Sequence, residues 1–156
     1  LCVLEKAKGA SITLNGQKFA SRDTYLVMQD PTRQLFSDTV IDEVTLGITR
    51  AEKQRIDAQA ILKELDLTDH EADHPQALSG GQRQRLVIAT ALAANKKVYI
   101  FDEPTSGVGY KHLVAISRVM RKLADTGAVV IVITHDAELV TEVADHAIHL
   151  DQINAC

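Results

Sequence analysis

Two short segments carry residues whose types and spacing suit phosphate chemistry. A Ser-Gly-Gly stretch at 79–81 precedes a predicted helix, where backbone N–H groups and the positive end of the helix dipole can meet a phosphate oxygen. Asp102 and Glu103 follow directly on an apolar strand-like run over 98–101. The first carboxylate could hold Mg²⁺ on a triphosphate and the second could polarise the attacking water. This combination predicts a site for nucleotide hydrolysis, with Asp102 beside the metal and Glu103 as the base.

Each of these strings has a plainer structural interpretation when it is taken alone. Asp102-Glu103-Pro104 could simply open a turn, because Asp and Pro are common in turns. The glycines after Ser79 could be a hinge behind an ordinary helix N-cap. The functional interpretation depends on finding both segments in order within one chain.

Two further polar residues follow predicted strands. Gln29 ends the run that begins at Thr24, and His135 comes after Ile131-Val132-Ile133-Thr134. Ligands of open α/β sheets gather at the carboxyl ends of the strands, so Gln29, Asp102/Glu103 and His135 are expected to converge. His135 could donate a hydrogen bond to a γ-phosphate, or it could cap the helix that begins at Asp136. Taken alone, the position of His135 before the helix favours the capping role.

The segment Asp69-His70-Glu71-Ala72-Asp73-His74 contains three types of side chain that could bind a metal: Asp, His and Glu. It has no nearby cysteine and no helix that would place two histidines on one face, as zinc motifs require. A solvated loop is therefore the favoured interpretation.

Composition and charge narrow the class of protein. Hydrophobic residues make up 46% and charged residues 24% of the 156 residues, which is typical of one globular domain. The longest apolar run, 128–133, is far shorter than the roughly 20 residues that span a bilayer. A net charge of −4 gives no general attraction to nucleic acid. Cys2 and Cys156 form neither a disulfide framework nor a metal pattern, which fits a reducing cytosol.

Apolar strands alternate with amphipathic helices along most of the chain. Residues 11–19 alternate around Asn15-Gly16, which predicts a β-hairpin. Buried strands are expected at 24–28, 98–101 and 128–133, with a last strand at 147–150. Helices are expected at 79–95, 110–124 and 137–144, and 40–65 has a helical pattern whose face would carry Ile56, Ala60, Leu62 and Leu65. This order predicts an α/β fold with a parallel sheet and a helical insertion around 38–90.

Four motifs in order resemble those of an ATP-binding cassette (ABC) ATPase domain, and the resemblance covers essentially the whole chain. They are Gln29, Leu78-Ser79-Gly80-Gly81-Gln82, the strand ending at Asp102-Glu103, and Ile133-Thr134-His135. By this resemblance they are the Q-loop, the signature motif, the Walker B strand with its catalytic Glu, and the switch His. The resemblance implies a P-loop NTPase-like core with ATP and Mg²⁺ as ligands. It assigns Glu103, His135 and Gln29 to catalysis, Asp102 and Gln29 to the metal, and Ser79, Gly80, Gly81 and Gln82 to the nucleotide.

The chain departs from the family pattern in two places. No G-x-x-x-x-G-K-[ST] loop occurs in the 156 residues, and Leu1-Cys2-Val3-Leu4-Glu5 is similar to the end of the helix that follows such a loop. The whole chain, residues 1–156, is therefore expected to be an ABC domain truncated at its N-terminus, inactive alone and prone to aggregate. Gly109 stands where the family usually has an Asp that couples two sites across a dimer.

The segment from Met28 to Val44 resembles the energy-coupling factor and cobalt/vitamin importer branch of the family. The resemblance implies two partners, a second ABC ATPase domain and a transmembrane transporter subunit that residues 34–36 would contact. It places the protein peripherally on the cytoplasmic face of the membrane, as the ATP-hydrolysing subunit of a solute importer. Two alternatives stay open: a catalytically silent partner that supplies only the signature face, and an ABC ATPase without a transport role. Binding to nucleic acid is not expected, and the sequence does not name the solute.

Overall fold

A three-stranded parallel sheet forms the centre of the structure. The computed structural model describes residues 13–14, 16–18 and 21–149. Strands β3 (Thr24–Val27), β4 (Val98–Asp102) and β5 (Val129–Ile133) lie in the order β3-β4-β5. Val27 pairs with Phe101, and Asp102 pairs with Ile133. The α/β fold with a parallel sheet that the sequence predicts is confirmed, with β3 one residue shorter and β4 one residue longer than expected.

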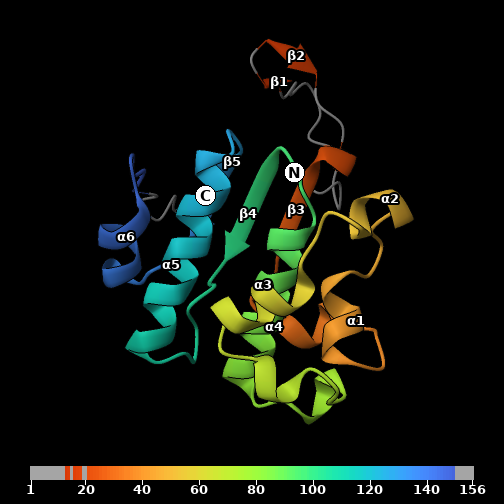
Figure 1. Ribbon diagram of the computed structural model, residues 1–156. Coiled ribbons are helices and arrows are strands. Elements are labelled where there is room, and N and C mark those ends of the chain that lie inside the picture. The colour runs from red at the N-terminus through yellow and green to blue at the C-terminus, as the bar shows by residue number, and fades with distance from the viewer. Residues whose placement is uncertain (1–12, 15, 19–20, 150–156) are drawn as a thin grey trace, which may run out of the picture.

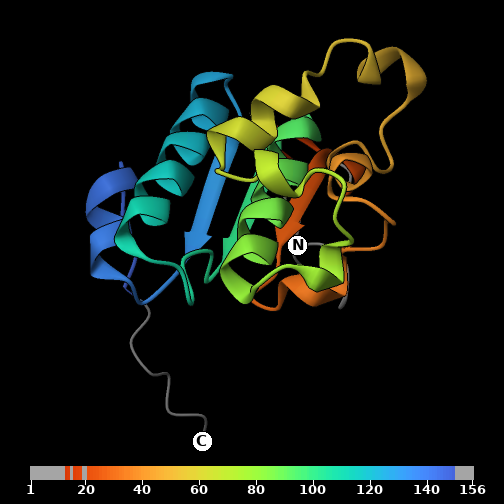
Figure 2. The ribbon, with the colours of Figure 1, turned by 60° about the horizontal axis from the view of Figure 1, so that its bottom comes forward.

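Two long helices cover one face of this sheet. Helix α4 (Gly80–Ala93) and helix α5 (Tyr110–Asp125) lie side by side against the strands (Figure 2). Tyr99 and Phe101 of β4 are almost completely buried in the resulting core. Their alternation along the strand points both side chains to the same face. The core therefore lies between β4 and the two helices, and the carboxyl end of β4 is held by the core's largest side chains.

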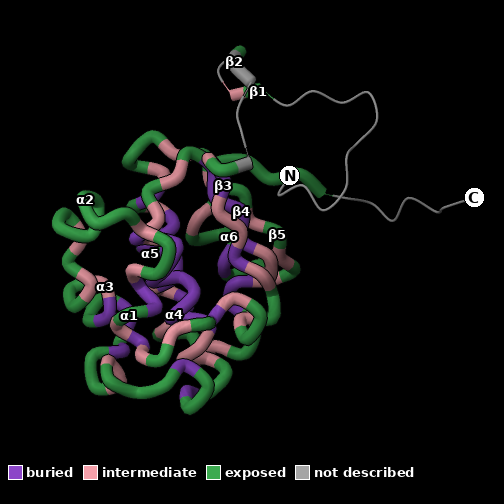
Figure 3. Tube along the Cα trace, turned by 90° about the vertical axis from the view of Figure 1, so that its right-hand side faces the viewer, coloured by how far each residue is buried: buried purple, intermediate pink, exposed green. Residues whose placement is uncertain are grey.

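Helix α4 is the central helix of the molecule. Eight consecutive residues, 84–91, are buried, which is unlike an amphipathic surface helix (Figure 3). Strand β3 and helices α1, α3 and α5 all contact it. The expected N-cap at Ser79 is present, and the helix ends near Ala93 rather than Asn95. Because residues 84–91 are buried on every side of the helix, the position of its first turn has little freedom.

The prediction of a fully buried strand at 128–133 was wrong for β5. Val129, Ile131 and Ile133 are 39%, 38% and 52% exposed, and they alternate with less exposed neighbours. β5 has only one neighbour, β4, among the strands that the structure describes. Helix α5 contacts one face of β5, so the side chains of the other face stay accessible. An exposed apolar edge strand is a recognised aggregation site. Aggregation of the chain stays a prediction.

The helical pattern over 40–65 breaks into three short helices rather than one face. They are α1 (Val40–Val44), α2 (Arg50–Lys53) and α3 (Ala58–Glu64). Gly47 adopts φ +73°, and Thr49 starts α2 with a reciprocal capping box, so the chain turns between α1 and α2. Leu62 and Leu65 are buried as expected, but Ala60 is exposed. The break at residues 54–57 changes the phase of the pattern and turns Ala60 to the surface.

The remaining elements are short. Within the described residues, 3₁₀ turns lie at Ser21–Asp23, Pro31–Gln34, Thr68–His70 and Pro75–Ala77. Helix α6 (Ala137–Val143) follows β5, one residue shorter than expected. Residues 147–149 of the predicted last strand are not a strand, and residue 150 lies outside the described residues. Strands β1 (Thr13–Leu14) and β2 (Gln17–Lys18) form the predicted antiparallel hairpin above the sheet (Figure 1).

Candidate active site

The carboxyl ends of β4 and β5 bring two of the predicted catalytic residues into contact. Asp102 ends β4 beside Ile133, so Glu103 and the Thr134-His135 pair leave neighbouring strands at the same edge. The backbone N–H of Glu103 donates to the carbonyl of Ile133 at 2.9 Å and extends the ladder by one residue. The parallel register therefore places these side chains together, as expected for an open α/β sheet.

The Glu103 carboxylate accepts three hydrogen bonds from the chain that follows β5. His135 Nδ1 lies 2.8 Å from Oε1, and the His135 backbone N–H donates to the same oxygen at 3.2 Å. The hydroxyl of Thr134 donates to Oε2 at 3.2 Å. Glu103 itself has φ +47°, a left-handed conformation that a non-glycine residue rarely adopts. Such strain persists where the surroundings hold it, and it is typical of functional sites.

The electrostatics of this contact favour the protonated form of His135. The hydrogen bond and the negative charge of Glu103 raise the pKa of His135 above its ordinary value of 6.5. The His135 side chain is 89% exposed and that of Glu103 only 17%, so solvent reaches the pair from the histidine side. An imidazolium beside a carboxylate can both hold that carboxylate in place and donate to an oxyanion.

Titration of His135 tests this contact directly. Its pKa is raised on folding, so the contact stabilises the folded chain fully below pH 6.5, with Glu103 ionised, and fades as the pH rises through the raised value. We expect the NMR titration of the His135 Cε1 proton to have its midpoint above 6.5, and the midpoint to fall in Glu103→Gln. His112 is the internal control, because burial and then Arg85 lower its pKa. An unchanged His135 midpoint in the variant would contradict the contact.

The carboxylate of Asp136 stabilises the loop that carries His135. The Asp136 side chain caps α6 by accepting from the backbone N–H groups of Glu138 and Leu139. It also accepts from the Thr105 hydroxyl at 2.8 Å, and this bond is the main cause of its lowered pKa. The sequence analysis missed the roles of Thr134, Thr105 and Asp136. Their positions directly after the two strands were the only signal that could have identified them.

Two other predicted residues lie near this edge without joining the contact. Gln29 is exposed, two residues beyond the end of β3. No hydrogen bond of its side chain, or of the Asp102 carboxylate, occurs within residues 21–149. Asp102 is partly exposed, and its carboxylate has no hydrogen-bond partner in this region. A free strand-end carboxylate of this kind suits Mg²⁺, which proteins often bind through one or two carboxylates and the phosphates of the substrate.

The predicted phosphate-facing turn is built around the start of α4. Ser79 and Gln82 form a reciprocal capping box: Gln82 N–H donates to Ser79 Oγ at 3.3 Å, and Ser79 N–H donates to Gln82 Oε1 at 2.7 Å. The Ser79 hydroxyl accepts this bond and keeps its own hydrogen available. Ser79 and Gly80 are exposed, and the first N–H groups of a helix have no partner within the helix. This turn, residues 79–82, is called the signature loop below.

The signature loop lies beside the segment that follows Glu103. A Cβ atom added to Gly81 would meet the Gly107 carbonyl oxygen at 3.5 Å and a Val108 methyl group at 3.7 Å. The two segments therefore pack backbone against backbone. The structure shows no hydrogen bond between the signature loop and Glu103 within the described part of the chain, so the two halves of the predicted site remain separate in this chain.

Comparison with known proteins places these motifs in one family. The model of the ABC transporter family matches residues 2–106. The chain belongs to the ABC transporter family. A Treponema denticola protein named as an ABC transporter ATP-binding protein is 40% identical over 154 residues, which cover 96% of this chain and 31% of that protein. The chain spans between a fifth and a third of the length of the first six curated relatives that it matches.

Two solved structures of ABC proteins share the fold and part of the sequence. The first is the ATP-binding cassette MJ0796, a dimer in a post-hydrolysis state with ADP and phosphate. It has a TM-score of 0.66 and 31% identity, over 78% of this chain and 56% of its own. The second is cbiO1 of Clostridium perfringens, part of the ABC transporter complex cbiONQ. It has a TM-score of 0.65 and 26% identity, over 89% of this chain and 61% of its own.

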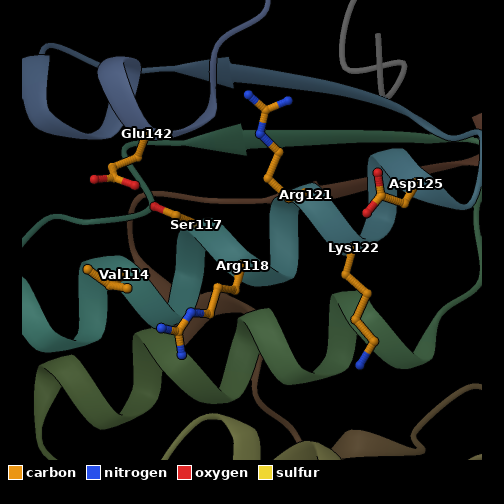
Figure 4. A pocket seen from close by; sticks show the side chains of 7 residues that line it. All are labelled: Val114, Ser117, Arg118, Arg121, Lys122, Asp125 and Glu142. Atoms are coloured by element: carbon orange, nitrogen blue, oxygen red, sulfur yellow. The ribbon is translucent and has the colours of Figure 1, made fainter.

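Two other regions of this ABC family chain do not form a site. Within the described ranges, which include segment 69–74, no three His, Cys, Asp or Glu side chains are arranged to hold a metal ion. An open groove between α5 and α6 is lined by charged side chains (Figure 4). Arg121 there pairs with Asp145 at 2.7 Å, and Lys122 pairs with Glu64 at 2.9 Å. None of the predicted site residues lines this groove.

None of the helices in the described part of this ABC family chain is both long enough and apolar enough to cross a bilayer.

Proposed function

We propose that this chain is the hydrolytic part of an ABC transporter's ATP-binding subunit, which turns ATP into ADP and phosphate to drive solute import. The contact between Glu103 and His135 is the observation that carries the proposal. A carboxylate with three hydrogen bonds at a solvent-accessible strand end is held in one orientation before substrate arrives. Such preorganisation is what general-base catalysis of water attack requires.

Each predicted catalytic residue then has a distinct task. Glu103 orients and polarises the attacking water and takes its proton, while His135 holds Glu103 and faces the γ-phosphate. Asp102 is the protein ligand for Mg²⁺, and Gln29 stands at the neighbouring strand end where it can reach the metal and the water. The magnesium ion would neutralise the charge that develops on the phosphate oxygens. Gln29 is exposed and without a described partner, so it is free to approach once nucleotide is present.

The signature loop serves the nucleotide of a second ABC domain. Ser79 offers a hydroxyl hydrogen at the positive end of α4. Gly80 and Gly81 offer unpaired backbone N–H groups there. No bond joins this loop to Glu103, which suits a composite site in which each domain completes the other. The dimeric ADP-bound state of MJ0796 supports this arrangement. Gly109, exposed at the start of α5, carries no side chain that could couple the two sites, so weaker coupling is proposed here.

The segment that follows Gln29 is the proposed docking site for a transmembrane subunit. Phe36 is 75% exposed, although its backbone N–H is fixed by the buried carboxylate of Glu43 at 2.7 Å. A large exposed apolar side chain on a fixed backbone suits a protein interface. The similarity to cbiO1 supports placement in the cobalt and vitamin importer branch. The protein would then be peripheral, on the cytoplasmic face of the membrane.

Nucleotide binding separates this function from that of a silent partner. We expect no calorimetric signal for Mg-ATP with the chain alone at a Kd tighter than about 1 mM, because it has no Gly-Lys-Ser/Thr loop. The same chain extended through its upstream reading frame should bind ATP in the micromolar range. If the extended form also fails to bind, the chain supplies only the signature face to an intact partner.

A further inference from the structure

His70 lies next to the signature loop, although no role in the site was predicted for it. It ends the 3₁₀ turn at Thr68–His70, and Asp73 lies three residues further on. His70 Nε2 is 2.7 Å from the side-chain nitrogen of Gln82, and His70 Nδ1 is 2.8 Å from Asp73 Oδ2. The imidazole therefore bridges an exposed loop and the first turn of α4.

The hydrogen bonds of Gln82 determine which ring nitrogen of His70 carries the proton. The Ser79 backbone N–H can only donate, so the Gln82 atom 2.7 Å away is the amide oxygen. The Gln82 NH₂ group must then face His70, and it can only donate. His70 Nε2 is consequently the acceptor, and the ring proton lies on Nδ1, where it is donated to the Asp73 carboxylate. With this tautomer, each hydrogen bond in the series Asp73–His70–Gln82–Ser79 joins one donor to one acceptor.

The loop that holds His70 is itself fixed by helix α1. The backbone N–H groups of Val40 and Ile41 at the start of α1 donate to the carbonyls of Asp73 and Glu71, both at 3.0 Å. Loop 70–73 thus satisfies helix N–H groups that have no partner within α1. Helix α1 also carries Glu43, whose carboxylate accepts from the backbone N–H groups of Phe36 and Ser37. Hydrogen bonds and chain connections therefore run without a gap from Phe36 to Ser79.

We propose that His70 is a positioning residue for the signature loop. Asp73 holds its Nδ1–H tautomer, its Nε2 holds the Gln82 amide, and that amide fixes the backbone of Ser79. Because α1 anchors the loop, a displacement of residues 36–44 would pass to the signature loop through His70. Any effect of this displacement on a bound nucleotide rests on the proposed function, whereas the fixing of the Ser79 backbone by Gln82 does not.

The tautomer of His70 is the first test. Long-range ¹H–¹⁵N NMR spectra of the neutral ring should show a protonated Nδ1 and an unprotonated Nε2. This is the less common tautomer of a free histidine side chain, so a merely exposed His70 would not show it. A protonated Nε2 would overturn the proposal, since it could not accept from Gln82.

Substitution of His70 is the second test. His70→Leu removes the acceptor, and we expect amide hydrogen exchange at Ser79 to become about fivefold faster, the factor that corresponds to one ordinary hydrogen bond. His70→Gln can offer an amide oxygen at the same place, so exchange should return to nearly the original rate. Asp69→Asn is the matched control, because Asp69 is exposed and its side chain makes no hydrogen bond in the described segments.

Unchanged Ser79 exchange in His70→Leu, or equal effects of Leu and Gln, would refute the positioning role. Both NMR measurements are made on the chain without nucleotide. Failure of ATP binding or hydrolysis would therefore count against the proposed function and leave these two results to be judged separately.

Discussion

Replacing Glu103 with Gln is expected to slow ATP hydrolysis by a factor of about 10² to 10⁴ when the chain is extended upstream by a Gly-Lys-Ser/Thr loop and paired with a second ABC domain. The amide keeps the size of the side chain but cannot take a proton from water. It also lacks the charge that raises the pKa of His135. ATP binding should be largely retained, because Glu103 touches the attacking water rather than the nucleotide in the proposed site.

The matched control is Glu138→Gln on α6. Glu138 is exposed in the first turn of that helix, and its removal should leave the rate within about twofold, as for most surface substitutions. Steady-state phosphate release and calorimetry with Mg-ATP measure the two effects separately. A Glu103→Gln protein that hydrolyses ATP at the original rate would exclude Glu103 as the base.

The double variant Glu103→Gln/His135→Ala tests whether the two residues act as a unit. Residues that act together have strongly non-additive effects on the rate. The double variant should therefore be hardly slower than Glu103→Gln alone. Fully multiplicative losses would mean that His135 contributes independently of the contact at 2.8 Å.

Features that depend on neighbouring residues in the sequence were predicted well. The start of α4 at Ser79 follows from a capping box within four residues, and α5 ends beside Gly127, which adopts φ +87°. The strand β4 is a short apolar run with clear limits. For the two helices, the groups that fix the ends are supplied by the helix itself or its immediate flanks, whereas the backbone hydrogen bonds of β4 come from β3 and β5.

Features that depend on distant partners were not predictable in the same way. The exposure of Ile131 reflects what lies beside β5 in the fold, and an apolar run has the same appearance whether one face or both are covered. The contact between Glu103 and His135 joins residues 32 positions apart and requires the β4–β5 register. The sequence placed both residues at strand ends, but only the fold supplied their distance. The link from His70 to Gln82 was missed because segment 69–74 was assessed only as a metal site.

The largest effect on stability is expected for Phe101→Ala. Phe101 is fully buried on β4, and its ring stacks on that of Tyr99 with centroids 6.4 Å apart. Its removal leaves a cavity between the sheet and the helices, which should lower the free energy of unfolding by about 3–5 kcal/mol. Domains of this size are typically stable by about 5–15 kcal/mol, so this is a large share. Urea denaturation followed by circular dichroism measures the change.

Phe36→Ala separates this packing effect from the docking role. The same side chain is removed, but Phe36 is 75% exposed, and the contact of its backbone N–H with Glu43 survives the substitution. The free energy of unfolding should change by no more than about 0.5 kcal/mol. Equal destabilisation by both substitutions would show that Phe36 belongs to the core. If Phe36→Ala leaves stability and ATP hydrolysis unchanged but reduces solute uptake with the membrane subunit present, the exposed ring serves docking, because coupling alone would then be lost.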